Sequence, residues 1–143
     1  MSGYQGDIDP EEAFSVLQSD PGAVLIDVRS QAEWHFVGLP DLSTLERELV
    51  LVEWAKFPGM VPDPDFAQAM KQRLEELGVA PDAKLLFLCR SGVRSRNAAI
   101  AMTAQGYGKC FNVSEGFEGD ADGEGHRGNR NGWKKRGLPW RQG

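Results

Sequence analysis

A cysteine flanked by two arginines is the part of this sequence whose residue types most clearly suggest chemistry. Cys89 follows the apolar run Leu85–Leu88 and opens the segment CRSGVRS, which carries Arg90 and Arg94. A short, continuous apolar run is typical of a parallel strand covered on both faces. The Ala-rich residues 96–105 predict a helix. Cys89 should therefore lie at the carboxyl end of a strand, facing a helix N-terminus, which is where ligands bind in open α/β sheets.

This placement predicts a small anion-binding loop around the sulfur. Unpaired N–H groups at a helix start and the helix dipole favour negative charge, and the two arginines add positive charge. The thiolate, which is the nucleophilic form of Cys89, should be favoured there. Gly92 can adopt a positive φ, which lets the loop close around the sulfur. We predict Cys89 as the catalytic nucleophile. The predicted substrate-binding loop comprises Arg90, Ser91, Gly92, Val93, Arg94 and Ser95.

A cysteine held by backbone N–H groups with an arginine behind it serves two known reactions, sulfur transfer and phosphate-ester hydrolysis. Phosphatases place five residues between the cysteine and the arginine. Here the residues between Cys89 and Arg94 are Arg90, Ser91, Gly92 and Val93. A tighter loop suits a single terminal sulfur better than a phosphoryl group, so the spacing favours sulfur transfer.

The loop CRSGVRS resembles the active-site loop of the rhodanese-like sulfurtransferases, and the resemblance covers most of the chain. Four more segments follow the family's order: residues 25–34 (LIDVRSQAEW), 37–40 (VGLP), 112–119 (NVSEGFEG) and 132–140 (GWKKRGLPW). Two departures concern the mouth of the site. Many members carry Gly-His-Ile-Pro-Gly-Ala after the Glu-Trp pair, whereas this chain lacks that histidine, and a polar Gly-rich insertion precedes Trp133.

The resemblance implies an α/β fold with three layers, in which helices flank both faces of a mostly parallel five-stranded sheet. It implies one domain over residues 1–143, with a flexible Gly-rich loop at 120–132 near the site. The implied activity moves a sulfane sulfur from thiosulfate or a similar anionic donor to a thiol or cyanide acceptor through a Cys89 persulfide. It requires no cofactor.

Two other classes of function stay open from the sequence. One is a sulfur-carrier or redox interaction module, in which the Cys89 persulfide delivers sulfur to a protein partner. The other is a cysteine-based phosphatase or arsenate reductase, which the loop spacing disfavours.

The supporting residues of the site follow the strand expected at residues 23–28. Asp27 and Arg29 emerge at its carboxyl end, and we expect an ion-pair brace with Glu33 rather than a catalytic role. Ser95 is expected to cap the helix through its hydroxyl. Cys110 is expected to be a small buried hydrophobe rather than a resolving thiol.

The remaining elements must build one sheet and its helices around this site. The expected strands are residues 4–8, 23–28, 49–54, 85–88 and 109–113, and the expected helices are residues 10–19, 31–36, 66–77 and 96–105. Asp9 should cap the first helix, with Pro10 at its first position.

Composition narrows the range of partners and compartments. A chain of 143 residues can bury one core without disulfides or metals, and its net charge of −5 argues against nucleic acid as a partner. No apolar run has the length of a membrane span, so no membrane partner is expected. Two cysteines are typical of a reducing cytoplasm. The acidic spacing in residues 120–124 resembles a calcium loop but lacks its final glutamate, so no metal is expected.

Overall fold

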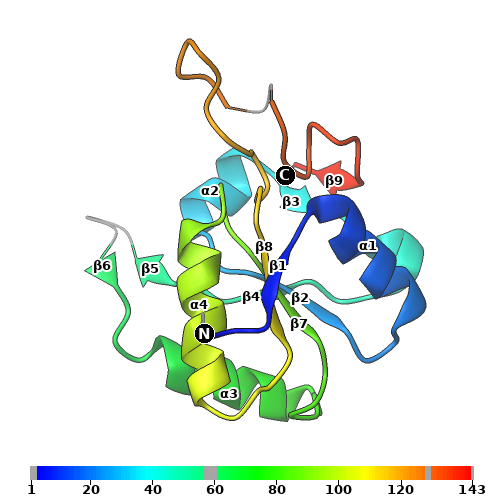
Figure 1. Ribbon diagram of the computed structural model, residues 1–143, viewed down its shortest axis with the longest axis vertical. Coiled ribbons are helices and arrows are strands. Elements are labelled where there is room, and N and C mark those ends of the chain that lie inside the picture. Colours follow the sequence, from blue (N-terminus) through cyan, green and yellow to red (C-terminus); the bar gives the residue numbers. More distant parts are fainter. Residues whose placement is uncertain (1–2, 57–60, 128–129, 143) are drawn as a thin grey trace.

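Five short strands form a parallel sheet in the order β1-β8-β7-β2-β4 (Figure 1). The computed structural model describes residues 3–56, 61–127 and 130–142. The strands of this sheet are β1 (Gly6–Ile8), β2 (Val24–Asp27), β4 (Val50–Leu51), β7 (Leu85–Leu88) and β8 (Cys110–Val113). The expected α/β class and five-stranded parallel sheet are confirmed, and β7, which precedes Cys89, is the central strand.

Helices cover both faces of the sheet. The helices are α1 (Pro10–Ser19), α2 (Gln31–Phe36), α3 (Phe66–Glu76) and α4 (Val93–Ala104), with a short 3-10 helix at Ser43–Leu45. Two further pairs of short strands are antiparallel: β3 (Leu39–Pro40) with β9 (Trp140–Arg141), and β5 (Ala55–Lys56) with β6 (Val61–Pro62). In Figure 1, α1 lies on one side of the sheet, and α3 and α4 lie on the other.

Two apolar clusters, one on each face, hold these layers together. On one face Met70 and Leu74 of α3 and Ala98 of α4 pack against Ile26 and Phe87. On the other face side chains of α1 and the C-terminal segment pack against the sheet: Ala13, Leu17, Phe117 and Trp133. All four residues of β7 have no exposed area, as expected for a central strand covered on both faces.

Local sequence signals account for the helix starts that precede the site. The Asp9 side chain accepts the backbone N–H of Glu12 at 2.8 Å, and Pro10 occupies the first position of α1. Ser30 and Glu33 form a reciprocal capping box at the start of α2. These caps fix the residues at which α1 and α2 begin.

Two elements differ from the sequence prediction. Helix α4 begins at Val93, three residues earlier than expected, because Gly92 with φ 108° allows the chain to turn directly from the loop into the helix. The strand expected at residues 49–54 is reduced to Val50–Leu51. Among the described residues no helix is both long and apolar enough to cross a bilayer.

A hollow of about 590 Å³ lies at the amino ends of the strands, away from Cys89. Arg47 lines it, but the Arg47 guanidinium donates to the carbonyls of Ala23 at 2.7 Å and Leu17 at 2.8 Å. These bonds tie the loop after β3 to the end of α1. The Arg47 cation is therefore engaged in holding backbone together.

Candidate active site

Cys89 lies directly after β7, with a side chain only 1 % exposed. Its Sγ accepts the backbone N–H of Gly92 at 3.1 Å. The Ser95 hydroxyl oxygen lies 3.2 Å from the same sulfur. Since Gly92 is the N-cap of α4, the sulfur lies at the positive end of the helix dipole. The geometry can stabilise negative charge on this sulfur or on an atom attached to it.

The loop around Cys89 is held tightly by the chain after β8. The N–H of Phe117 donates to the Cys89 carbonyl at 2.8 Å, and the N–H groups of Glu118 and Gly119 donate to the Arg90 carbonyl at 3.0 and 3.1 Å. A Cβ on Gly92 would lie 2.3 Å from the Ser114 carbonyl oxygen. Only glycine fits there, both because of this contact and because of the positive φ.

Ser95 does not cap the helix, so that prediction is wrong. Because α4 begins at Val93, Ser95 falls in its first turn and is completely buried, and no side chain caps this helix. The Ser95 hydroxyl instead lies between Cys89 and the Asn112 side chain, whose Oδ1 is 2.5 Å away. Sequence reasoning missed Asn112 as part of the site. The available signal was a polar residue within the buried strand CFNV.

Arg94 forms a two-pronged ion pair with Glu33 of α2. The Nη1–Oε1 and Nη2–Oε2 distances are 2.6 and 2.9 Å, and the side chains are 20 % and 19 % exposed. Burial by itself raises the pKa of Glu33, but the bonds and charge of Arg94 outweigh it and hold the pKa below its usual value. Burial lowers the pKa of Arg94, and the bonds to Glu33 outweigh it and raise the pKa.

Asp27 and Arg29 form a separate, fully buried pair. Arg29 Nε lies 2.9 Å from Asp27 Oδ1, and Nη2 lies 2.6 Å from Oδ2. Nη2 also donates to the Gly38 carbonyl at 2.8 Å, and the guanidinium lies 4.3 Å from the centre of the Phe117 ring. The expected brace with Glu33 is therefore corrected: in the described structure Glu33 pairs with Arg94, because α2 directs its carboxylate toward α4.

Arg90, Ser91 and Val93 form the rim of the loop. Arg90 is exposed, and its side chain forms no ion pair or hydrogen bond with any described residue. Ser91 is half-buried, and Val93 is 59 % exposed. The cation of Arg90 is thus available to a soluble anion, whereas that of Arg94 is already neutralised by Glu33.

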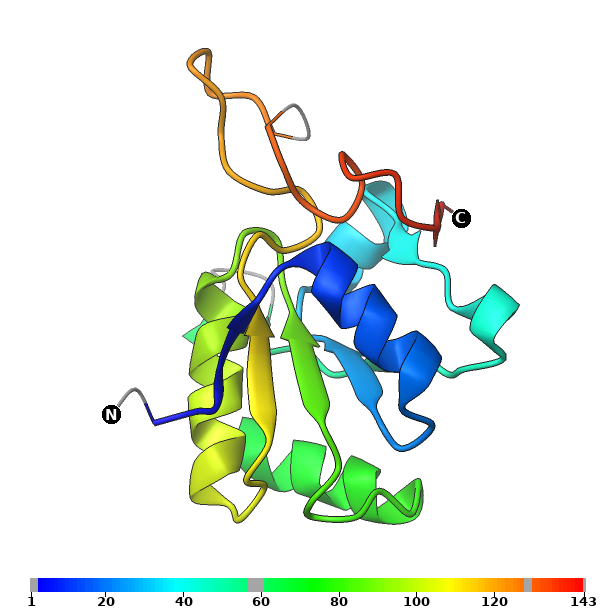
Figure 2. The same cartoon turned by 45° about the vertical axis from the view of Figure 1, so that its right-hand side comes forward.

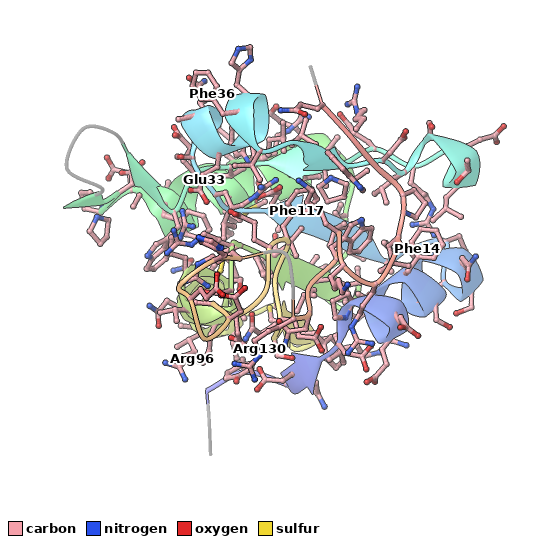
Figure 3. The ribbon with its side chains drawn as sticks, turned by 90° about the horizontal axis from the view of Figure 1, so that it is seen from above. Phe14, Glu33, Phe36, Arg96, Phe117 and Arg130 are labelled. Atoms are coloured by element: carbon pink, nitrogen blue, oxygen red, sulfur yellow. The ribbon has the colours of Figure 1, made fainter. Side chains whose placement is uncertain are left out.

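Figure 3 shows the molecule from the edge that carries the loop. Glu33 and Phe117 lie toward the centre of the view, and Phe36 points outward at the periphery. The buried Nε1 of Trp34 has no hydrogen-bond partner among the described residues. Trp133, in contrast, is fully buried and donates to the Pro139 carbonyl at 2.7 Å, so it fixes the C-terminal segment.

Cys110 lies at the opposite end of the sheet from Cys89. Cys110 pairs with Leu85 in the sheet register, so Cys89 lies four residues further along the neighbouring strand, roughly 13 Å away. Cys110 has no exposed area, its Sγ lies 3.3 Å from the Tyr107 carbonyl, and burial raises its pKa to about 11. It packs as a small hydrophobe, as expected, and cannot reach Cys89 as a resolving thiol.

The Gly-rich insertion rises above the same edge of the sheet as the loop (Figure 2). Its two ends are clamped where the Asp120 N–H donates to Asn131 Oδ1 at 2.8 Å and Asn131 Nδ2 donates to Asp120 Oδ2 at 3.1 Å. At its tip Asp122 Oδ1 accepts the N–H groups of Glu124 and His126, each at 2.9 Å. Residues 128 and 129 of the predicted flexible loop lie outside the described residues, and its flexibility stays a prediction. No cluster of three metal-ligating side chains occurs in the described ranges.

A strand that ends in a cysteine, followed by a tight loop at a helix N-terminus in a parallel sheet, defines a class of small α/β domains with a cysteine at the centre of an anion-binding loop. The chain belongs to the rhodanese-like family: the model of the rhodanese-like domain matches residues 11–122. Membership of that family, which the sequence predicted, is confirmed.

Two relatives show how far the sequence similarity extends. The Rickettsia conorii protein RC0915 is 33 % identical over 129 residues, covering 90 % of this chain and 91 % of the relative. A protein named sulfurtransferase from Allochromatium vinosum is 25 % identical over 111 residues, covering 78 % of this chain and 83 % of that protein. The similarity therefore extends through 91 % of the first relative and 83 % of the second.

Solved structures agree on the fold. The crystal structure of Rv0390 from M. tuberculosis has a TM-score of 0.87 and 48 % identity, covering 98 % of this chain and 99 % of that one. The polysulfide-sulfur transferase homodimer of Wolinella succinogenes has a TM-score of 0.60 and 21 % identity, covering 99 % of this chain and 81 % of that one. The second similarity concerns the fold alone.

Proposed function

We propose that the protein is a sulfurtransferase that carries a sulfane sulfur on Cys89. The observation that carries the proposal is the position of Cys89 Sγ, which accepts the Gly92 N–H at 3.1 Å at the N-terminus of α4. A backbone donor and a helix dipole aimed at the sulfur stabilise negative charge there, on the attacking thiolate and, after transfer, on the persulfide. Membership of the rhodanese-like family supports the same chemistry.

The reaction is a double displacement. The Cys89 thiolate attacks the outer sulfur of thiosulfate or a similar donor, a Cys89–sulfur bond forms, and the donor's S–S bond breaks with its electron pair leaving on sulfite. An acceptor thiolate or cyanide then attacks the terminal sulfur, and Cys89 leaves as a thiolate. Electrons balance within these steps, so no external oxidant or reductant takes part.

The two arginines divide their roles in this proposal. Arg90 is exposed and unpaired within the described residues, so it attracts the anionic donor to the mouth of the loop. Arg94 is bound to Glu33 and positions the first turn of α4. Asp27 and Arg29 hold the neighbouring strand end and do not contact the donor.

The engagement of Arg94 also bears on phosphatase activity. An arginine at the end of such a loop serves a phosphatase by binding phosphate oxygens with its two-pronged guanidinium. Here Glu33 occupies both prongs at 2.6 and 2.9 Å. Together with the four-residue spacing, this arrangement favours sulfur transfer over phosphate-ester hydrolysis.

Delivery of sulfur to a protein is the second candidate function. Val93 presents a side chain that is 59 % exposed at the rim of the loop, where the surface of a partner protein could contact it. In this version thiosulfate and cyanide are surrogates for a protein donor or acceptor. The chemistry at Cys89 is the same.

Steady-state turnover of thiosulfate and cyanide tests the enzymatic proposal. The wild-type protein should produce sulfite and thiocyanate, Cys89→Ser should abolish turnover, and Cys110→Ser should retain it because Cys110 lies at the other end of the sheet. Turnover that survives in Cys89→Ser would overturn the proposal. A persulfide that forms on Cys89 but transfers only to a protein thiol would favour the carrier role.

A further inference from the structure

A chain of hydrogen bonds connects Cys89 to an exposed carboxylate on the edge strand. The Ser95 hydroxyl lies 3.2 Å from Cys89 Sγ and 2.5 Å from Asn112 Oδ1. Asn112 Nδ2 donates to Asp7 Oδ1 at 3.1 Å. Ser95 and Asn112 are buried, whereas Asp7 is exposed on β1. This series of hydrogen bonds therefore runs from α4 through β8 to the edge of the sheet.

The orientation of the Asn112 amide is determined by Asp7. An ionised carboxylate only accepts hydrogen bonds, so the NH₂ group of Asn112 must face Asp7 and its carbonyl oxygen must face Ser95. Tyr4 reinforces this arrangement because its hydroxyl donates to the same Asp7 oxygen at 2.8 Å. The opposite orientation would bring two acceptor oxygens together at 3.1 Å.

The orientation of Asn112 in turn sets the direction of the Ser95 hydroxyl. A hydroxyl has one proton, and Ser95 has two acceptors within reach, Asn112 Oδ1 and Cys89 Sγ. While Asn112 presents its oxygen at 2.5 Å, the proton of Ser95 is directed there and its lone pairs face the sulfur. That arrangement accepts a bond from the protonated thiol. It leaves a thiolate without the Ser95 donor.

We propose that Asp7 and Asn112 are positioning residues that lower the reactivity of Cys89 in the resting protein, by keeping the Ser95 proton directed away from the sulfur. Full stabilisation of negative charge on the sulfur, in the attacking thiolate or in the persulfide, requires Ser95 to turn its proton to the sulfur and release Asn112. The proposal deepens the sulfurtransferase function and rests on it.

Other charged groups lie at the same edge and must be separated from this effect. They are Arg90 and Arg94 from the loop and α4, Arg96 of α4 near Tyr4, Asp27 and Arg29 from the end of β2, Glu33 from α2, and Glu118 after β8. Removing the negative charge of Asp7 would favour a thiolate through simple electrostatics as well. The test therefore needs a variant that keeps all of these charged groups but lacks the Ser95 hydroxyl.

The experiment measures the rate of Cys89 alkylation by iodoacetamide as a function of pH, in a double-mutant cycle of Asp7→Asn and Ser95→Ala. Asp7→Asn permits Asn112 to turn its NH₂ toward Ser95, which then donates to the thiolate, so alkylation at neutral pH should rise about tenfold, the scale of one hydrogen bond to a charged group. In the Ser95→Ala background the same substitution should change the rate less than about twofold.

Glu118→Gln is the matched control for charge, because Glu118 lies beside the loop and, among the described residues, its side chain forms no hydrogen bond with Asn112. This variant should change the rate by less than about twofold. Equal acceleration by Asp7→Asn with and without Ser95 would overturn the proposal in favour of electrostatics. An unchanged rate in the single variant would overturn it as well. Alkylation needs no sulfur donor, so these outcomes are independent of whether thiosulfate is a substrate.

Discussion

Arg94 and Glu33 join the two helices that flank the loop, with Nη1–Oε1 and Nη2–Oε2 distances of 2.6 and 2.9 Å. The pair links the first turn of α4 to α2, 61 residues away in the chain. The arginine that defines the loop in sequence is thus an internal brace. Of the two loop arginines, Arg90 is therefore the one whose positive charge is available to bind a soluble anion.

Replacement of Arg90 by alanine should weaken donor binding more than chemistry. We expect the KM for thiosulfate to rise about fivefold with a smaller change in kcat, because an exposed charge contributes mainly to binding of the anion. Arg96→Ala is the matched control, since Arg96 is likewise an exposed arginine but lies on α4 rather than in the loop. Equal KM values in the wild type and Arg90→Ala would contradict the division of roles between the arginines.

Glu33→Gln should destabilise the protein at neutral pH but not in acid. Glutamine preserves the capping-box contact with Ser30. The difference in free energy of unfolding between the wild type and the variant therefore reports the ion pair alone, and we expect about 1–2 kcal/mol for a largely buried pair. The folded-state pKa of Glu33 is lowered, so its contribution is complete above its unfolded value of about 4.3. The contribution is lost as the pH falls below that value.

Urea unfolding of the wild type and Glu33→Gln at several pH values checks this. The two free energies of unfolding should converge in acid. If the difference between the two free energies of unfolding stays constant from neutral pH into acid, the effect does not come from the charge of Glu33.

Gly92→Ala should impair both the fold and the site. A Cβ at this position would lie 2.3 Å from the Ser114 carbonyl oxygen, in a backbone with φ 108°. We expect a loss of about 2 kcal/mol or more in the free energy of unfolding, with slower alkylation of Cys89 because the Gly92 N–H moves away from the sulfur.

Thermal unfolding compared with Gly108→Ala checks this prediction. Gly108 does not have a positive φ, and its Cβ would have no neighbour within 4 Å, so that variant should behave like the wild type. Comparable melting temperatures for both variants would contradict the role assigned to Gly92.

The sequence predicted the frame of the site because its signals are local. The continuous apolar run before Cys89, the Asp9–Pro10 helix start and the glycine at position 92 each constrain nearby backbone. Partners distant in the chain were not predictable in the same way. Glu33 was assigned to Arg29, since nothing in the sequence shows that α2 turns its carboxylate toward α4.

Ser95 was misassigned for a related reason. The first residue of α4 depends on Gly92 adopting a left-handed conformation against Ser114, and an earlier start turns a capping hydroxyl into a buried one. Asn112 and Asp7 meet Ser95 only through the parallel pairing of β1 with β8. Sequence patterns give the period of a strand but not the identity of its neighbours.

The most direct test of the account is the mass of the Cys89 peptide after the protein has been incubated with thiosulfate and digested without reductant. The account predicts one added sulfur on the Cys89 peptide and none on the Cys110 peptide. An unmodified Cys89 in a protein that hydrolyses phosphate esters or reduces arsenate would contradict it.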